Sequence, residues 1–338
     1  MSRPVAPRTA AEGDPAAEYR AARETAIVAD LAGRGRLRIS GADAFDLMHR
    51  LTTNSIRDLA SGEGRPAIFA TAKGRIIDLV LFHRFDEELL CTTGEGRAGI
   101  VVSWIDRYTF REDVRVEDRS ATHCTIGIYG TKAADVVSIL CPAVAAGWAA
   151  HHAERFNVEG IEGVLARTYP LAGEGFLATV TAERGPALID RLLERHAGMR
   201  VAGPAALEAL RIEAGMPAPE RELTEDYNPW EAGLGDAVSL DKGCYVGQEV
   251  IARLDTYSKV SKNLVRLKIA GPDVPPRGSA LEIAGRRTGT LTSVAAVPGE
   301  DRIIGLGYVQ DEHAESGMEL HVAAPGGGIG ATVEGPAR

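Results

Sequence analysis

The sequence predicts an α+β body followed by an all-β domain. The chain has 338 residues, more than one hydrophobic core usually holds, so two or three domains are expected. Strand-like and helix-like patterns alternate up to about residue 250. From about residue 260 only short β-like runs remain, separated by Gly, Pro and Asp. These observations favour mixed helices and strands in the body and an antiparallel structure at the C-terminus.

Hydrophobic periodicity predicts the elements of the first half. Phe45, Met48 and Leu51 recur on one face of a helix, and the apolar residues of 100–108 repeat at the same spacing. Residues 124–128 alternate as a half-buried strand does. In chain order we expect a strand at 36–40, a helix at 42–51, strands at 67–71, 76–85 and 88–92, a helix at 97–108, and strands at 114–116 and 124–128.

Glycine and proline delimit the elements of the second half. The helix expected at 186–197 has Pro186 in its first turn and Gly198 just beyond its end, and the helix at 203–213 opens with Pro204 and precedes Gly215. Further helices are expected at 132–140 and from residue 248. Six short β runs then predict a small antiparallel barrel or sandwich, at 264–270, 281–284, 288–297, 302–309, 318–323 and 329–333.

Composition indicates an ordinary globular protein. Apolar residues make up 45% and charged residues 25% of the chain, and no apolar run approaches the roughly 18 to 20 residues that span a bilayer. The net charge of −9 argues against a general binder of nucleic acids or anionic membranes. Residues 1–19 lack a hydrophobic signal core and are expected to be a flexible lead-in. Because the sequence shows neither a signal core nor a membrane-spanning run, we expect a cytoplasmic location.

Metal and nucleotide motifs are missing from the sequence. The four cysteines form no CxxC pair and the eight histidines no HExxH, so neither a disulfide framework nor a permanent metal is expected. Gly-x-Gly runs at 33–35, 62–64 and 94–96 complete neither GxGxxG nor a P-loop. We interpret these three runs as turns.

One segment carries candidate chemistry. Cys244 lies between Gly243 and Gly247, beside Lys242, and just before a possible helix at 248–251. A thiol near a cation and a helix N-terminus tends toward the reactive thiolate. The alternative is a buried cysteine in a glycine-rich turn.

The same segment resembles a family signature. Residues 242–249 agree with K-G-C-[YF]-x-G-Q-E, the signature of the YgfZ family, which lies within the glycine-cleavage T-protein (aminomethyltransferase) superfamily. The matching residues are Lys242, Gly243, Cys244, Tyr245, Gly247, Gln248 and Glu249. The resemblance extends over nearly the whole chain from about residue 20, through segments 40–44, 51–54, 72–78, 211–217, 228–234, 289–293 and 305–309.

The resemblance implies three domains around a central opening. Two would be ferredoxin-like α+β domains and the third the C-terminal antiparallel β-barrel. We expect a discontinuous folate-binding domain from 20–56 plus 121–258, an inserted domain at 57–120, and the barrel at 259–338. The implied ligand is tetrahydrofolate or another reduced folate.

Three residues are expected to contact that folate. The resemblance puts Glu213 at the superfamily's pterin-binding glutamate, and Glu213 falls in the last turn of a predicted helix, where the helix dipole disfavours an anion. A pterin offers two parallel donors that a carboxylate accepts as a fork; the alternative is an exposed glutamate without a role. Asn228 belongs to a matched segment, and Arg253 to a basic stretch (241–268) that either meets the glutamate tail of folate or is a solvated face.

The resemblance also bears on activity. Aminomethyltransferases have an essential Asp in the region of residues 91–99, where this chain has only Glu95, and they lack the cysteine signature. We therefore expect a factor that binds tetrahydrofolate and uses Cys244 in the maturation or repair of iron–sulfur proteins, with iron–sulfur client or assembly proteins as partners. The alternatives are a folate-dependent aminomethyl or methyl transferase and a scaffold without a ligand.

Overall fold

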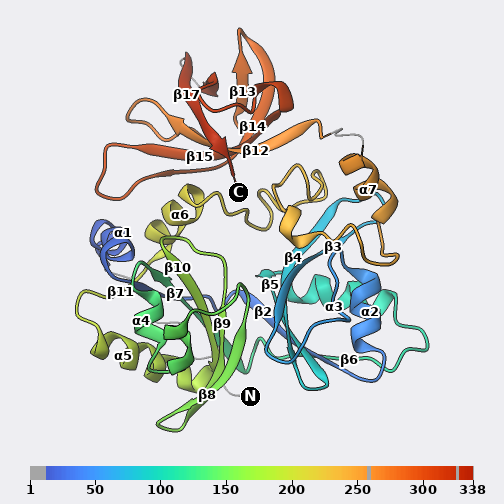
Figure 1. Ribbon diagram of the computed structural model, residues 1–338. Coiled ribbons are helices and arrows are strands. Elements are labelled where there is room, and N and C mark those ends of the chain that lie inside the picture. Colours follow the sequence, from blue (N-terminus) through green and yellow to red (C-terminus); the bar gives the residue numbers. More distant parts are fainter. Residues whose placement is uncertain (1–12, 257–259, 325–326, 338) are drawn as a thin grey trace.

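The computed structural model of the protein describes residues 13–256, 260–324 and 327–337, and contains two α+β units and a closed β-barrel (Figure 1). The barrel lies at one end of the molecule, and the two units lie side by side beneath it. The predicted fold class is confirmed, and the C-terminal domain is a barrel rather than a sandwich. Within the described ranges, no helix is both long and apolar enough to cross a lipid bilayer.

The first unit is a six-stranded sheet covered by helices. Its strand order is β11-β1-β7-β10-β9-β8, and every pair is antiparallel except β1 with β11. Helices α4 and α5 pack on one face over a core of Ile, Val and Leu. The elements are α1 (Pro15–Glu24), β1 (Ile27–Asp30), β7 (His123–Gly130), α4 (Ala133–Val137), β8 (Ala153–Val158), β9 (Ile161–Arg167), β10 (Glu174–Thr181), α5 (Gly185–Arg195), β11 (Arg200–Val201) and α6 (Pro204–Glu213).

The second unit is a five-stranded antiparallel sheet in the order β3-β4-β5-β2-β6. Helices α2 and α3 share one hydrophobic core with this sheet, and α7 lies beside it on the way to the barrel (Figure 1). The elements are β2 (Arg34–Ser40), α2 (Ala44–Leu51), β3 (Gly64–Ala70), β4 (Ile76–Phe85), β5 (Glu88–Glu95), α3 (Ala98–Arg107), β6 (Arg115–Asp118) and α7 (Gln248–Thr256).

The predicted boundary between the two α+β domains is wrong. Strand β2 was expected in the first domain, but Leu37 pairs with Cys91 of β5, and β2 therefore belongs to the second sheet. Helix α2 packs into the same core through Leu47 and Met48. The inserted unit therefore begins near residue 34 rather than at 57, because strand pairing over a long sequence separation decides where β2 lies.

The N-terminal lead-in is shorter than predicted. Residues 15–19 were expected to be flexible, but they form the first half of α1, whose N-terminus is capped by Asp14 through the backbone N–H groups of Ala16 and Ala17. Tyr19 and Ala22 are buried against the body. Residues 1–12 of the predicted lead-in lie outside the described residues.

The barrel closes in the strand order β12-β15-β14-β13-β16-β17. Its inward-facing Val, Leu and Ile form a separate core. All six predicted β runs correspond to strands: β12 (Lys262–Ile269), β13 (Ala280–Ile283), β14 (Arg286–Ala296), β15 (Ile303–Gln310), β16 (Glu319–Ala324) and β17 (Gly327–Pro336).

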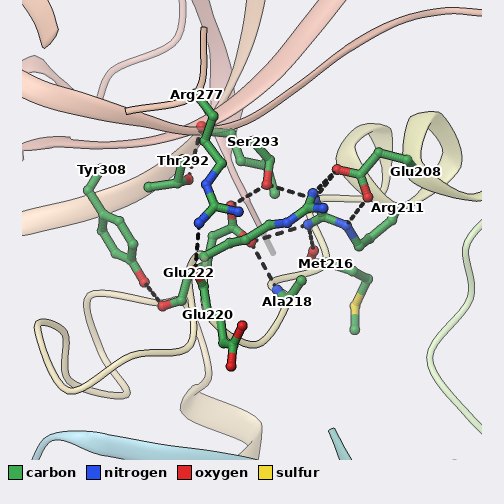
Figure 2. A network of polar contacts seen from close by, with 12 residues as sticks. Glu208, Arg211, Met216, Ala218, Glu220, Glu222, Arg277, Thr292, Ser293 and Tyr308 are labelled. Carbon is green, nitrogen blue, oxygen red and sulfur yellow. Dashed lines mark hydrogen bonds and ion pairs between the residues drawn. The ribbon is translucent and has the colours of Figure 1, made fainter. Parts of the chain in front are cut away.

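A buried polar network joins the barrel to the body. Figure 2 shows Arg211 of α6 reaching between Glu208 and Ser293, and its guanidinium donates to Ser293 Oγ at 2.7 Å and to Glu222 Oε2 at 3.2 Å. Ser293 donates to the other Glu222 oxygen at 2.6 Å. Tyr308 of the barrel donates to the Glu222 carbonyl at 2.9 Å. This network fixes the barrel over α6 and the segment that follows it.

Candidate functional site

The signature segment is held against the C-terminal end of α2. Lys242 is 8% exposed, and its Nζ donates to the carbonyls of Thr52 at 2.6 Å and Asn54 at 2.7 Å, and also to that of His49. These carbonyls lie at and just beyond the last turn of α2, where acceptors lack intrahelical partners and a cation is favourable. Lys242 therefore caps α2. Burial lowers the pKa of Lys242 to about 7, and the charge of Arg57 adds to this effect.

Backbone contacts fix the rest of the segment. Val246 N donates to Arg50 O at 3.1 Å, so the segment also satisfies a second carbonyl of the last α2 turn. Gly247 has a φ of +86°, and a Cβ at this position would lie 2.5 Å from Thr71 O. Only glycine allows this close approach to the turn before β4. The signature glycine is therefore required by packing.

Cys244 projects from this fixed segment into solvent. It is exposed, whereas Lys242 and Tyr245 on either side are buried. Cys91 and Cys141 are buried and Cys124 is half-buried, so Cys244 is the accessible thiol of the four. The prediction that Lys242 acts beside the thiol does not fit this geometry, because all three donors of its ammonium are taken by carbonyls. Gln248, half-buried, begins α7 directly after the segment.

A buried carboxylate that sequence reasoning did not select lies next to the segment 91–99. Asp78 of β4 accepts from Gly94 N at 2.9 Å through Oδ2, and its Oδ1 has no partner. Burial raises the pKa of Asp78 to about 7, although the Gly94 N–H and the charge of Arg97 oppose the shift. The segment thus has a carboxylate beside it that comes from a neighbouring strand. The signal in the sequence was a single acid between Ile77 and Leu79, inside an apolar strand.

A cavity of about 530 Å³ lies between the two sheets. One wall comes from β2, β4 and β5, and the other from β8, β9 and β10, which face each other in the middle of the molecule (Figure 1). Leu90, Val164 and Leu177 give it apolar walls, and Arg36 and Glu162 are among its polar groups. A volume in this range, mostly apolar lining and a few polar groups are typical of small-molecule sites.

The three residues predicted to bind folate lie elsewhere. Glu213 Oε1 accepts from Arg302 at 2.9 Å, and Oε2 accepts from Tyr19 at 2.7 Å and from Arg23. Burial alone would raise the pKa of Glu213, but the hydrogen bonds from Tyr19 and Arg302 hold it below its ordinary value. Both carboxylate oxygens are therefore engaged within the protein, and a pterin-binding role for Glu213 stays a prediction.

Asn228 and Arg253 have different surroundings. Asn228 is buried, and its Oδ1 accepts from the backbone N–H groups of Trp230 and Glu231, both at 3.0 Å, so its oxygen stabilises a turn. Arg253 is exposed on α7. Of the basic stretch, Lys242 is buried in the α2 cap and Lys259 lies outside the described residues. None of Glu213, Asn228 and Arg253 lines the cavity between the sheets, and their folate-binding roles stay predictions.

Comparison with known proteins identifies the family. The model of the GCVT N-terminal domain matches residues 3–242, and that of the glycine cleavage T-protein C-terminal barrel domain matches residues 262–337. The chain belongs to the glycine-cleavage T-protein family. The YgfZ resemblance of the signature segment is a finer assignment within this family.

Individual relatives agree with the family. An aminomethyltransferase of Symbiobacterium thermophilum is 31% identical over 94% of this chain and 87% of its own length. A chloroplastic protein of Arabidopsis thaliana, provisionally named a transferase, is 31% identical over 90% of this chain and 69% of its own length. The crystal structure of glycine cleavage system aminomethyltransferase T from Bartonella henselae has the same fold, with a TM-score of 0.81 at 21% identity over 95% of this chain and 88% of the other.

Proposed function

We propose that this T-protein family member binds a reduced folate between its two sheets and uses Cys244 in the maturation or repair of iron–sulfur proteins. The observation that carries the proposal is the position of Cys244. It is an exposed thiol on a segment whose neighbouring side chains and backbone are held in place. The resemblance of this segment to the YgfZ signature supports the link to iron–sulfur proteins.

The residues of the inter-sheet cavity fit a folate. Its apolar walls suit the ring faces of a pterin and a benzoyl group, and its arginines suit the carboxylates of the glutamate tail. Glu162 has no ion pair in the described part of the chain and accepts one hydrogen bond, from Asn157 at 2.9 Å, whereas Glu88 is engaged by Arg38 and Arg155. A carboxylate without a counter-charge is a suitable partner for the parallel donors of a pterin. When bound, a tetrahydrofolate supplies a carrier for one-carbon units.

The thiol chemistry follows from accessibility. Iron–sulfur clusters are held by cysteine thiolates, so an exposed thiol can lose its proton to solvent and bind, as the thiolate, an iron of a client's cluster that has an open coordination position. The client protein can reach Cys244 because no part of the described chain covers it. Lys242 contributes by fixing the segment, since its donors are occupied by carbonyls.

Substitution of the thiol tests this proposal. Cys244→Ala is expected to retain the fold and tetrahydrofolate affinity and to lose complementation of a strain with an iron–sulfur-enzyme defect. Cys124→Ala, which removes a half-buried thiol, is the matched control and should complement. Full complementation by Cys244→Ala would count against a thiol mechanism.

Asp78 favours a second candidate, a folate-dependent aminomethyl or methyl transferase. A buried carboxylate with a pKa near 7 has the properties of a general acid or base. Several relatives of this chain are named aminomethyltransferases. Incubation with tetrahydrofolate and an aminomethyl donor should then yield methylene-tetrahydrofolate, and Asp78→Asn should slow this by ~100-fold or more. No product from the wild-type protein would exclude this candidate.

A further inference from the structure

Arg36 on the cavity wall has hydrogen-bonding capacity that the protein does not use. The residue is 6% exposed and lines the cavity between the sheets. Its Nη2 donates to Ser120 O at 2.8 Å and to Ala32 O at 3.1 Å. Its Nε and Nη1 are buried and have no partner. Buried donors are nearly always satisfied, so two unsatisfied ones on one guanidinium require an explanation.

Arg36 also lacks a counter-charge. No carboxylate of the described residues forms an ion pair with it, whereas Arg119 on the same cavity binds Glu117 at 2.8 Å and Arg155 binds Glu88 at 3.1 Å. A buried charge without a partner is costly, and proteins normally pair such a group. A ligand anion would supply what Arg36 lacks.

Two basic residues lie next to Arg36 on the cavity wall. Arg119 N donates to Arg36 O at 2.8 Å and His123 N donates to Arg119 O at 2.9 Å, so the three residues lie next to one another on the cavity wall. Burial, with the charges of Arg119 and Arg36 added, lowers the pKa of His123. Burial also lowers the pKa of Arg36, although Asp118 and Asp30 lie near enough to oppose the shift. Arg36 therefore has carboxylates nearby, but none of them forms an ion pair with it among the described residues.

We propose that Arg36 binds a carboxylate of the glutamate tail of the folate and makes the cavity selective for folates over pterins without a tail. The inference rests on the proposed folate binding. Nη2 is taken by two carbonyls, and the unused Nε and Nη1 point to different sides of the guanidinium, so each can donate one charge-assisted hydrogen bond to an anion. Leu90 on the same wall provides apolar contact for the benzoyl group that precedes the tail.

Calorimetric titration with tetrahydrofolate and with 6-methyltetrahydropterin tests the inference. The wild-type protein should bind tetrahydrofolate ~10- to 100-fold more tightly than the pterin, the range expected for hydrogen bonds to a charged group. Arg36→Gln should remove most of this preference and leave pterin affinity unchanged. Arg36→Lys, which keeps the charge but not the guanidinium N–H groups, should retain only part of it. Arg38→Gln, which alters a paired arginine of the same strand that does not line the cavity, is the matched control and should keep the preference.

Each result bears on one of the two claims. Equal affinity of the wild-type protein for both ligands would overturn the role of Arg36 and leave the proposed function standing. No binding of either ligand would instead overturn the proposed function. If Arg36→Gln fails to fold, wild-type binding of p-aminobenzoylglutamate is compared with that of its dimethyl ester. Weaker binding of the ester supports the inference, and equal binding overturns it.

Discussion

Lys242 and Cys244 are two residues apart but have opposite environments. The sequence suggested a cation beside a thiol, because spacing alone does not tell where a lysine side chain ends. In the structure the Lys242 ammonium is buried among the carbonyls at the end of α2, and Cys244 is exposed. The lysine of the signature therefore acts on structure, and the cysteine remains available for chemistry.

Removing the Lys242 ammonium is expected to destabilise the protein. Lys242→Met leaves the carbonyls of Thr52 and Asn54 buried without this donor, which should cost about 1–3 kcal/mol of the free energy of unfolding. Lys73→Met, at an exposed position in the neighbouring turn, is the control and should change little. Urea denaturation measures both. Equal stability of the two variants would show that the cap contributes nothing.

Asp78 should make stability depend on pH. Its folded-state pKa of about 7 lies above the ordinary 3.8, so between these values the folded state binds more protons than the unfolded state. The contribution to the free energy of unfolding is therefore fully present below pH 3.8 and is lost as pH rises through 7, by up to about 4 kcal/mol. Asp78→Asn should lack this fall. Parallel stability curves for wild-type and variant from pH 4.5 to 8 would contradict the raised pKa.

At the scale of elements, local sequence patterns were sufficient to predict helices and strands that pack against neighbours close in the chain. Helices α2, α3 and α6 and all six barrel strands follow from apolar periodicity and from Gly and Pro at their ends. Strands β8, β9 and β10 were not predicted, because residues 153–181 mix charged and apolar residues without clean alternation. The predicted helix at 132–140 shortens to α4, which ends at Val137.

Gly247 is expected to be intolerant of a side chain. Gly247→Ala places a Cβ 2.5 Å from Thr71 O in a backbone with φ of +86°, and should cost about 1–3 kcal/mol of the free energy of unfolding. Gly243→Ala is the control in the same segment, since nothing lies within 4 Å of a Cβ added there. Thermal denaturation of the two variants gives the comparison. A Gly247→Ala protein as stable as Gly243→Ala would mean that the segment adjusts freely.

At the scale of the whole molecule, the sequence predicted the individual elements and motifs better than the way in which they pack together. The signature around Cys244 and the T-protein resemblance were readable as local motifs. The cavity was not, because its walls come from β2, β5 and β10, which pairing and sheet packing bring together from across the chain. The domain boundary failed for the same reason, since the partners of β2 lie some fifty residues and more away.

The docking of the barrel depends on Glu222. This carboxylate is fully buried and accepts from Arg211, Ser293 and the backbone of Ala218 (Figure 2). Glu222→Gln leaves Arg211 without this counter-charge and should cost about 3 kcal/mol of the free energy of unfolding. Glu225→Gln, exposed on the same segment, is the control and should be neutral. Equal urea midpoints for the two variants would show that other contacts hold the barrel.

A crystal structure of the protein grown with tetrahydrofolate, kept reduced throughout, tests the central claim most directly. We expect ligand density in the cavity between the sheets, against Leu90 and Leu177, with a tail carboxylate at Arg36 and with Cys244 still exposed. Density for the folate at Glu213, with the inter-sheet cavity empty, would contradict it.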